Sequence, residues 1–102
     1  MEQALLAFFE RVARKDAAQL RKIAREPCFR VEQERWSFTL PELYRFLQEQ
    51  DAVFGRVDYK RFRRLVLASP VNRVLKPHGA EIAIADNRGK ADRSRYALVW
   101  RS

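Results

Sequence analysis

The stretch SPVNRVLKPHGAEIAI, residues 69–84, predicts a short helix that ends at a glycine and continues at once into a strand. Ser69 and Pro70 are typical of an N-cap and a first helical residue. Gly79 suits the position just after a helix, where a positive φ is common. We therefore expect a helix over residues 70–78 that is joined directly to a strand.

The residues that follow predict a β-hairpin. Residues 80–85 (AEIAIA) and 95–100 (RYALVW) alternate between larger and smaller or polar side chains, as strands with one covered face do. Residues 86–94 (DNRGKADRS) between them are polar, and Gly89 can take a left-handed conformation there. The hairpin should therefore carry a long, basic tip.

Two more helices are expected upstream of this join. Thr39 precedes an apolar run at helical spacing and has a glutamate three positions later, which predicts a capped helix over residues 40–50. Asp58 caps a second helix over residues 59–67, whose basic side chains should face water. Residues 53–57 between them are too few for a further helix and suit a brief strand or turn.

The amino-terminal part predicts an amphipathic helix over residues 2–25, or two helices joined near Asp16, ended by Pro27. Residues 28–38 are expected to be extended or irregular. The first helix carries a bulky apolar stripe made of Leu5, Phe8, Phe9 and Val12.

This order of elements resembles a winged helix-turn-helix domain over residues 39–101. The resemblance implies an α+β fold with a three-helix core, a C-terminal β-hairpin wing and an additional N-terminal helix within residues 1–27. In that family the second helix of the pair enters the DNA major groove, and a short strand completes the sheet of the wing. On length, residues 1–102 should form a single domain.

The resemblance also implies a set of nucleic-acid-binding positions. Some would face the groove from helix 70–78, and some would lie on the wing and neutralise phosphates. They are Asn72, Arg73 and Lys76 on the helix and Arg88, Lys90 and Arg93 on the wing. Two further candidate binding positions are Ser69, at the N-terminal end of helix 70–78 where unpaired amides suit a phosphate, and Arg95.

The charge of the chain favours a polyanionic partner. Its 21 Lys and Arg residues outnumber 13 acids, for a net charge of +8. Residues 1–57 hold 10 bases and 9 acids, whereas residues 58–102 hold 11 bases and 4 acids. The basic surface should therefore belong to the second half.

Other classes of function find little support in the sequence. Cys28 is the only cysteine, so an internal disulfide is excluded and a cytoplasmic location is the default expectation. No apolar run is long enough to span a bilayer, so we expect no membrane partner. His78, the only histidine, falls on an apolar helix face. We expect no catalytic residue, no metal site and no cofactor.

The leading interpretation is a sequence-specific DNA-binding protein, a transcriptional regulator that binds double-stranded DNA. The apolar stripe of the first helix then suggests a homodimer, because such a stripe usually marks an interface when its own domain does not cover it. Two alternatives stay open at this point. One is a winged-helix module that binds an acidic protein partner through Trp36, Phe38 or Trp100, and the other is RNA binding.

Overall fold

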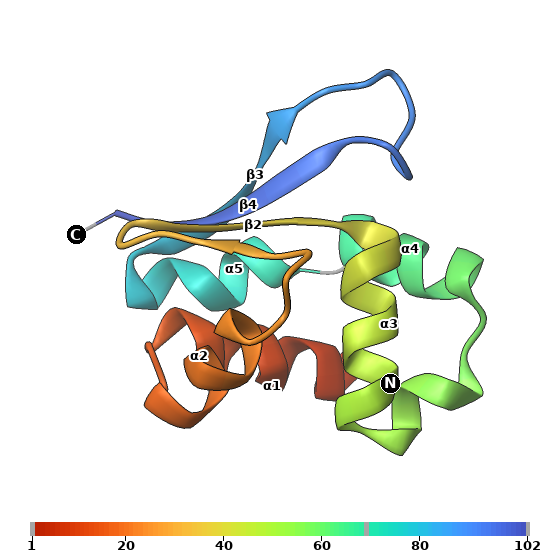
Figure 1. The fold of residues 1–102 in the computed structure, drawn as a ribbon, viewed down its shortest axis with the longest axis horizontal. Coiled ribbons are helices and arrows are strands. Elements are labelled where there is room, and N and C mark those ends of the chain that lie inside the picture. Colours follow the sequence, from red (N-terminus) through yellow and green to blue (C-terminus); the bar gives the residue numbers. More distant parts are fainter. Residues whose placement is uncertain (1, 69, 102) are drawn as a thin grey trace.

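A computed structural model describes residues 2–68 and 70–101. It places five α-helices on one side of a four-stranded antiparallel sheet (Figure 1). The elements in chain order are α1 (Glu2–Ala13), α2 (Ala17–Ala24), β1 (Arg30–Val31), β2 (Arg35–Thr39), α3 (Leu40–Gln50), α4 (Tyr59–Ala68), α5 (Val71–Leu75), β3 (Ala80–Asp86) and β4 (Arg95–Trp100), with 3-10 turns at Ala52–Arg56 and Lys76–His78. The predicted α+β class is confirmed.

The strands lie in the order β1-β2-β4-β3, so the β3–β4 hairpin is extended by β2. Trp36 of β2 pairs with Leu98 of β4, which pairs on its other side with Ile82 of β3. The strand that completes the sheet therefore lies directly before α3. Of the brief strand or turn expected at residues 53–57, the strand alternative was wrong, because β2 takes that place in the sheet.

Residues 52–56 form a 3-10 turn in place of that strand. The carboxylate of Asp51 accepts a hydrogen bond from the amide of Val53, which starts the turn. Phe54 and Val57 are buried and anchor the segment to the core. A side-chain cap and two buried contacts favour a turn here, because an isolated strand of this length has no partner to hold its backbone.

The amino-terminal segment folds as two helices, the second of the two arrangements that the sequence allowed. Lys15 takes a positive φ of 58° between them. Asp16 caps α2 by accepting a hydrogen bond from the amide of Ala18 at 3.0 Å.

The apolar stripe of α1 is buried inside its own chain. Leu5, Phe9 and Val12 are fully buried, and Phe8 is 3% exposed. Because the stripe is already covered, it cannot also form the predicted homodimer interface. The expectation that the domain leaves this stripe open was wrong.

The stripe is covered by aromatic rings from other elements, which pack with its own Phe8 and Phe9 in a cluster that we call the aromatic core. Trp36 lies at its centre, with ring centroids 6.0 Å from Phe8, 5.3 Å from Phe29 and 4.6 Å from Phe38. Edge-to-face and tilted contacts of this kind add stability beyond the area that they bury. The members of the aromatic core are Phe8, Phe9, Phe29, Trp36, Phe38 and Phe46.

The join between helix and strand that the sequence predicts is confirmed at Gly79, but the helix before it is shorter. Gly79 has a φ of 70°, and a Cβ atom there would lie 2.7 Å from the carbonyl oxygen of Arg101. α5 covers only Val71–Leu75, and residues 76–78 tighten into a 3-10 turn. Pro77 sits in that turn and cannot donate to an α-helical ladder, which accounts for the change.

Candidate nucleic-acid interface

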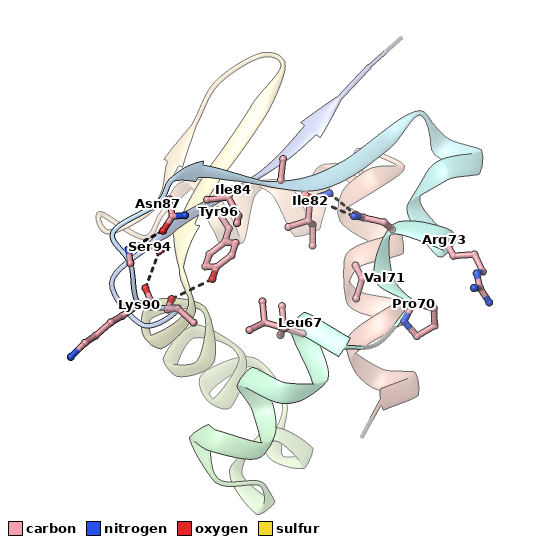
Figure 2. A pocket seen from close by; sticks show the side chains of 15 residues that line it. Leu67, Pro70, Val71, Arg73, Ile82, Ile84, Asn87, Lys90, Ser94 and Tyr96 are labelled. Carbon is pink, nitrogen blue, oxygen red and sulfur yellow. Dashed lines mark hydrogen bonds between the residues drawn. The ribbon is translucent and has the colours of Figure 1, made fainter.

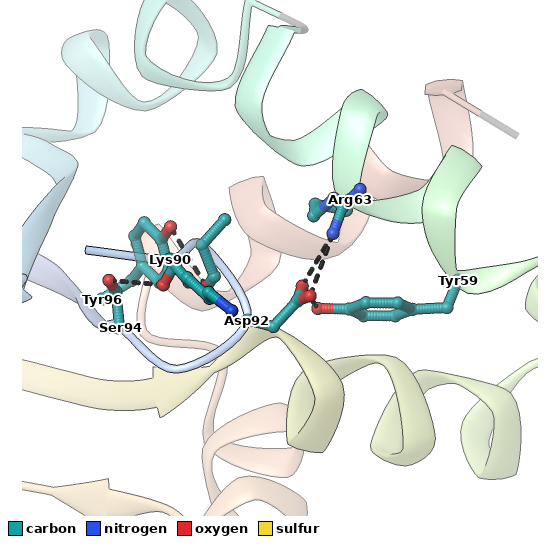
Figure 3. Close-up of polar contacts among 7 residues, drawn as sticks. Tyr59, Arg63, Lys90, Asp92, Ser94 and Tyr96 are labelled. Carbon is teal, nitrogen blue, oxygen red and sulfur yellow. Dashed lines mark hydrogen bonds and ion pairs between the residues drawn. The ribbon is translucent and has the colours of Figure 1, made fainter. Parts of the chain in front are cut away.

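The tip of the β3–β4 hairpin, residues 87–94, is fastened to α4 through one carboxylate. Asp92 accepts a hydrogen bond at 2.6 Å from the Tyr59 hydroxyl. Arg63 donates from Nη1 to both oxygens of the same carboxylate at 3.0 Å (Figure 3). The predicted wing is thus held against α4 at its tip, by residues about thirty positions away in the chain.

This contact also sets the charge states of its members. The hydrogen bonds from Tyr59 and then from Arg63 lower the pKa of Asp92, so its carboxylate is ionised at neutral pH. Burial raises the pKa of Tyr59, and its hydrogen bond to Asp92 raises it further. The phenol therefore remains a donor well above neutral pH, and the loop is held by an ionised acceptor between two donors.

A buried serine organises the inside of the loop. Ser94 is 3% exposed, and its hydroxyl donates to the carbonyl of Lys90 at 2.8 Å while accepting from the amide of Arg88 at 3.1 Å. Gly89 takes the positive φ that the sequence predicts, and its amide binds the side chain of Asn87. Sequence reasoning treated this loop as a basic tip and missed the roles of Ser94 and Asp92.

The basic residues predicted on the wing fall into three situations. Arg88 is paired with Asp86 at 2.9 Å. Lys90 and Arg93 are exposed near the anchored tip. Arg95 lies at the start of β4, half-buried and paired in the sheet with Thr39.

The positions predicted on helix 70–78 are also divided. The side chain of Asn72 is used within the fold, because its amide group donates to the carbonyl of Ile82 at 3.2 Å and accepts from the amide of Ile82 at 2.7 Å. Both polar atoms that would read a base edge are engaged in holding α5 to β3. Arg73 and Lys76 are exposed, and Ser69 lies outside the described residues.

A second set of bases lies on α4. Lys60, Arg61 and Arg64 are exposed, whereas Phe62 and Val66 on the opposite side of the helix are buried. Arg63 lies between the two faces and forms the contact with Asp92. The bond from α4 to the loop therefore brings the bases of two distant segments to the same end of the molecule.

The acidic, cysteine and histidine side chains outside this contact are arranged as follows. Within residues 2–68 and 70–101, no three His, Cys, Asp or Glu side chains gather in a way that could hold a metal ion. Burial is the main cause that raises the pKa of the Cys28 thiol, and the nearby Glu42 carboxylate raises it further. The raised pKa disfavours the thiolate form. His78 is half-buried, with its Nε2 atom 3.8 Å from Glu10.

The described part of the chain contains no helix with the length and apolar content that a bilayer crossing requires. These features define a small basic α+β protein with a four-stranded antiparallel sheet and an anchored hairpin. No protein-family model, no curated protein and no solved structure matches the chain.

Proposed function

We propose that this protein binds double-stranded DNA through the exposed bases of α4 and of the hairpin loop. We call this surface the basic face, and its members are Lys60, Arg61, Arg64, Lys90 and Arg93. The observation that carries the proposal is the contact of Asp92 with Tyr59 and Arg63, which fixes the loop relative to α4. Fixed cations bind a polyanion with less loss of conformational freedom than mobile ones do.

The position of β2 favours α4 over α5 as the helix that enters the groove. In the winged-helix order that the sequence resembles, the short strand that completes the sheet comes before a pair of helices, and the second helix of the pair enters the groove. Here β2 is that strand, and the two helices that follow it are α3 and α4. α4 has ten residues and is therefore about 15 Å long, and an α-helix about 10–12 Å across fits a major groove about 12 Å wide. α5 has five residues, is packed against α1 and β3, and uses Asn72 internally.

A salt titration of binding to random duplex DNA tests the proposal. If about four to five phosphates are neutralised, the logarithm of the binding constant should fall with the logarithm of salt at a slope of about −4. Replacing Lys60, Arg61 and Arg64 together with Gln should make that slope shallower by about three. The same titration with double-stranded and single-stranded RNA identifies the preferred nucleic acid.

A matched control uses two bases on α2 and the base at its C-cap. Arg21, Lys22 and Arg25 are exposed, and replacing them with Gln removes the same total charge from an element outside the basic face. We expect the slope for this control to stay close to that of the unchanged protein. Equal losses in the two triple variants would mean that only net charge matters, and absence of binding at low salt would end the proposal.

A further inference from the structure

A groove of about 660 Å³ opens between the helices and the hairpin (Figure 2). One wall is formed by the end of α4 and the start of α5, with Leu67, Pro70 and Val71. The other is formed by β3, with Ile82 and Ile84, and the anchored loop closes one end. This volume is within the range of sites that hold ligands or peptide side chains.

The walls of the groove are apolar and unusually open to solvent. Leu67 is 52% exposed and Ile84 is 59% exposed, which makes them two of the most exposed large apolar side chains among the described residues. The hydroxyls that line the groove are already used, since Tyr96 donates to the carbonyl of Ala91 and Ser94 donates to that of Lys90. The side chains of the groove therefore offer apolar contact rather than polar recognition.

The backbone of β3 supplies the polar recognition instead. β3 is an edge strand that pairs with β4 on one side only. On its free side, Asn72 bonds both the amide and the carbonyl of Ile82, as a neighbouring strand would. Backbone groups in an antiparallel strand alternate in direction, and the register of β3 with β4 is regular from Ala80 to Ile84 and shifts only between Ile84 and Asp86, so the amide of Ile84 points to the same free side. The groove thus runs beside a strand edge at which the backbone of Ile82 is already paired with Asn72 and the backbone of Ile84 is open to a further strand.

The charged side chains around the groove favour an occupant with negative charge. No acidic side chain is among the described residues that line it, and Arg73 and Lys90 lie on opposite sides of it (Figure 2). Both cations are exposed. An occupant with an apolar centre and acidic ends would match this arrangement.

We propose that the groove binds an extended, acidic segment of a partner protein, which adds to the free edge of β3. The segment pairs its backbone with Ile84 and continues the strand-like pairing that Asn72 begins at Ile82. Alternate apolar side chains of the segment enter the groove beside Leu67, and its acidic ends face Arg73 and Lys90. Backbone pairing supplies affinity and the apolar groove supplies specificity, as in other complexes formed by strand addition. This site is separate from the basic face, except that Lys90 borders both.

The test uses ¹⁵N-labelled protein and short peptides of about eight residues, the length of an ordinary strand. The peptides carry Val, Ile, Leu or Phe at every second position, Thr between them and Glu at both ends. We expect saturable shifts of the Ile84 and Leu67 amide signals and slower hydrogen exchange at Ile84. A version with N-methyl groups on alternate backbone amides, and one with Lys in place of Glu, should both bind much more weakly.

Two variants and a matched control complete the test. Leu67→Glu places a negative charge, of the same sign as the peptide ends, on an apolar wall of the groove. It should weaken binding of the peptides by on the order of tenfold. Lys90→Gln should weaken it by about two- to fivefold. Val31→Glu makes the same kind of change on β1, at the opposite edge of the sheet, where Val31 is 37% exposed, and should have no effect.

Three results would overturn the proposal. One is the absence of any shift at Ile84 with all of the peptides. Another is equal binding of the N-methylated or Lys-containing peptides, because recognition would then not involve the strand edge or the two cations. The third is that octanoate, which has no backbone to pair with β3, shifts the Ile84 and Leu67 signals as strongly as the peptides do. The groove would then be a site for a small apolar acid. Because no nucleic acid is present in these measurements, they are independent of DNA binding.

Discussion

The aromatic core and the groove are both rich in apolar side chains, but only the first is closed. In the aromatic core, Phe9 of α1 meets Trp36 and Phe38 of β2, and all three are fully buried. In the groove, Leu67 and Ile84 face each other across open space and remain more than half exposed. The chain itself covers the apolar side chains of the aromatic core and leaves those of the groove open.

The distribution of charge follows the same division. Residues 1–57, which supply the whole aromatic core, are nearly neutral, whereas residues 58–102 carry seven net positive charges. The open apolar surface therefore lies in the half that attracts anions. An apolar stripe in the sequence does not by itself mark an interface, since the stripe that looked most suited to one is the best covered.

The largest expected effect is on the free energy of unfolding, which a substitution in the aromatic core should lower far more than one in the groove. Phe9→Ala should lower the free energy of unfolding by about 3–5 kcal/mol, because it leaves a cavity in a fully packed site. Leu67→Ala should change it by less than about 0.5 kcal/mol, because its side chain is already half in water. Urea unfolding of both variants measures the difference. Equal and small effects would mean that the apolar stripe of α1 is not covered by the aromatic core as described.

A second prediction concerns the join at Gly79. This residue connects α5, which packs against α1, and the 3-10 turn after it to the start of β3. Gly79→Ala should lower the free energy of unfolding by about 1–3 kcal/mol, because the residue has a positive φ and the added Cβ would meet the Arg101 carbonyl. Gly55→Ala is the matched control, since nothing lies within 4 Å of a Cβ built there. Thermal unfolding compares the two, and a neutral Gly79→Ala would show that the join is not rigid.

A third prediction tests whether the hairpin loop depends on its anchor. Asp92→Asn removes the charge that Arg63 binds, so the loop should open more often while the aromatic core stays closed. We expect faster hydrogen exchange at the amides of Arg93 and Ser94, which donate to the Lys90 carbonyl, and no change in α1. Glu49→Gln on α3 makes the same change in charge elsewhere and should leave the loop amides unaltered.

The smallest effect should appear only in acid. The pKa of Asp92 is lowered in the folded state, so its contribution to loop docking is complete above the ordinary pKa of 3.8 and is lost as the pH falls through the lower folded value. Loop exchange rates, corrected for intrinsic exchange, should therefore be constant from pH 7 to about pH 5 and rise below about pH 4. Loop opening near neutral pH would contradict this assignment.

Much of the local structure could be predicted from the sequence because its signals are local. Thr39 caps α3, and Asp58 caps α4 by accepting a hydrogen bond from the amide of Arg61 at 2.8 Å, both as expected. Gly79 and Gly89 take the positive φ values that turns require. Each of these devices needs only a few neighbouring residues, so the order of types along the chain is sufficient to place it.

The candidate site could be predicted only in part. The excess of bases after residue 57 is a property of composition, and the exposure of Lys90 and Arg93 agrees with it. The internal use of Asn72 could not be predicted, because it depends on β3 passing beside α5. Asp92 gave no signal either, since an aspartate in a polar loop is usually hydrated.

The sequence by itself determined the α+β class, the start of α3 and of α4, the hairpin and the uneven charge. Only the tertiary structure decided that β2 completes the sheet, that Trp36 and Phe38 cover α1, and that Asp92 joins the loop to α4. Caps and alternation act between residues a few positions apart, so they are visible in the order of the chain. Sheet pairing, ring packing and the Asp92 contact join residues far apart, and these depend on which surfaces meet when the whole chain closes on itself.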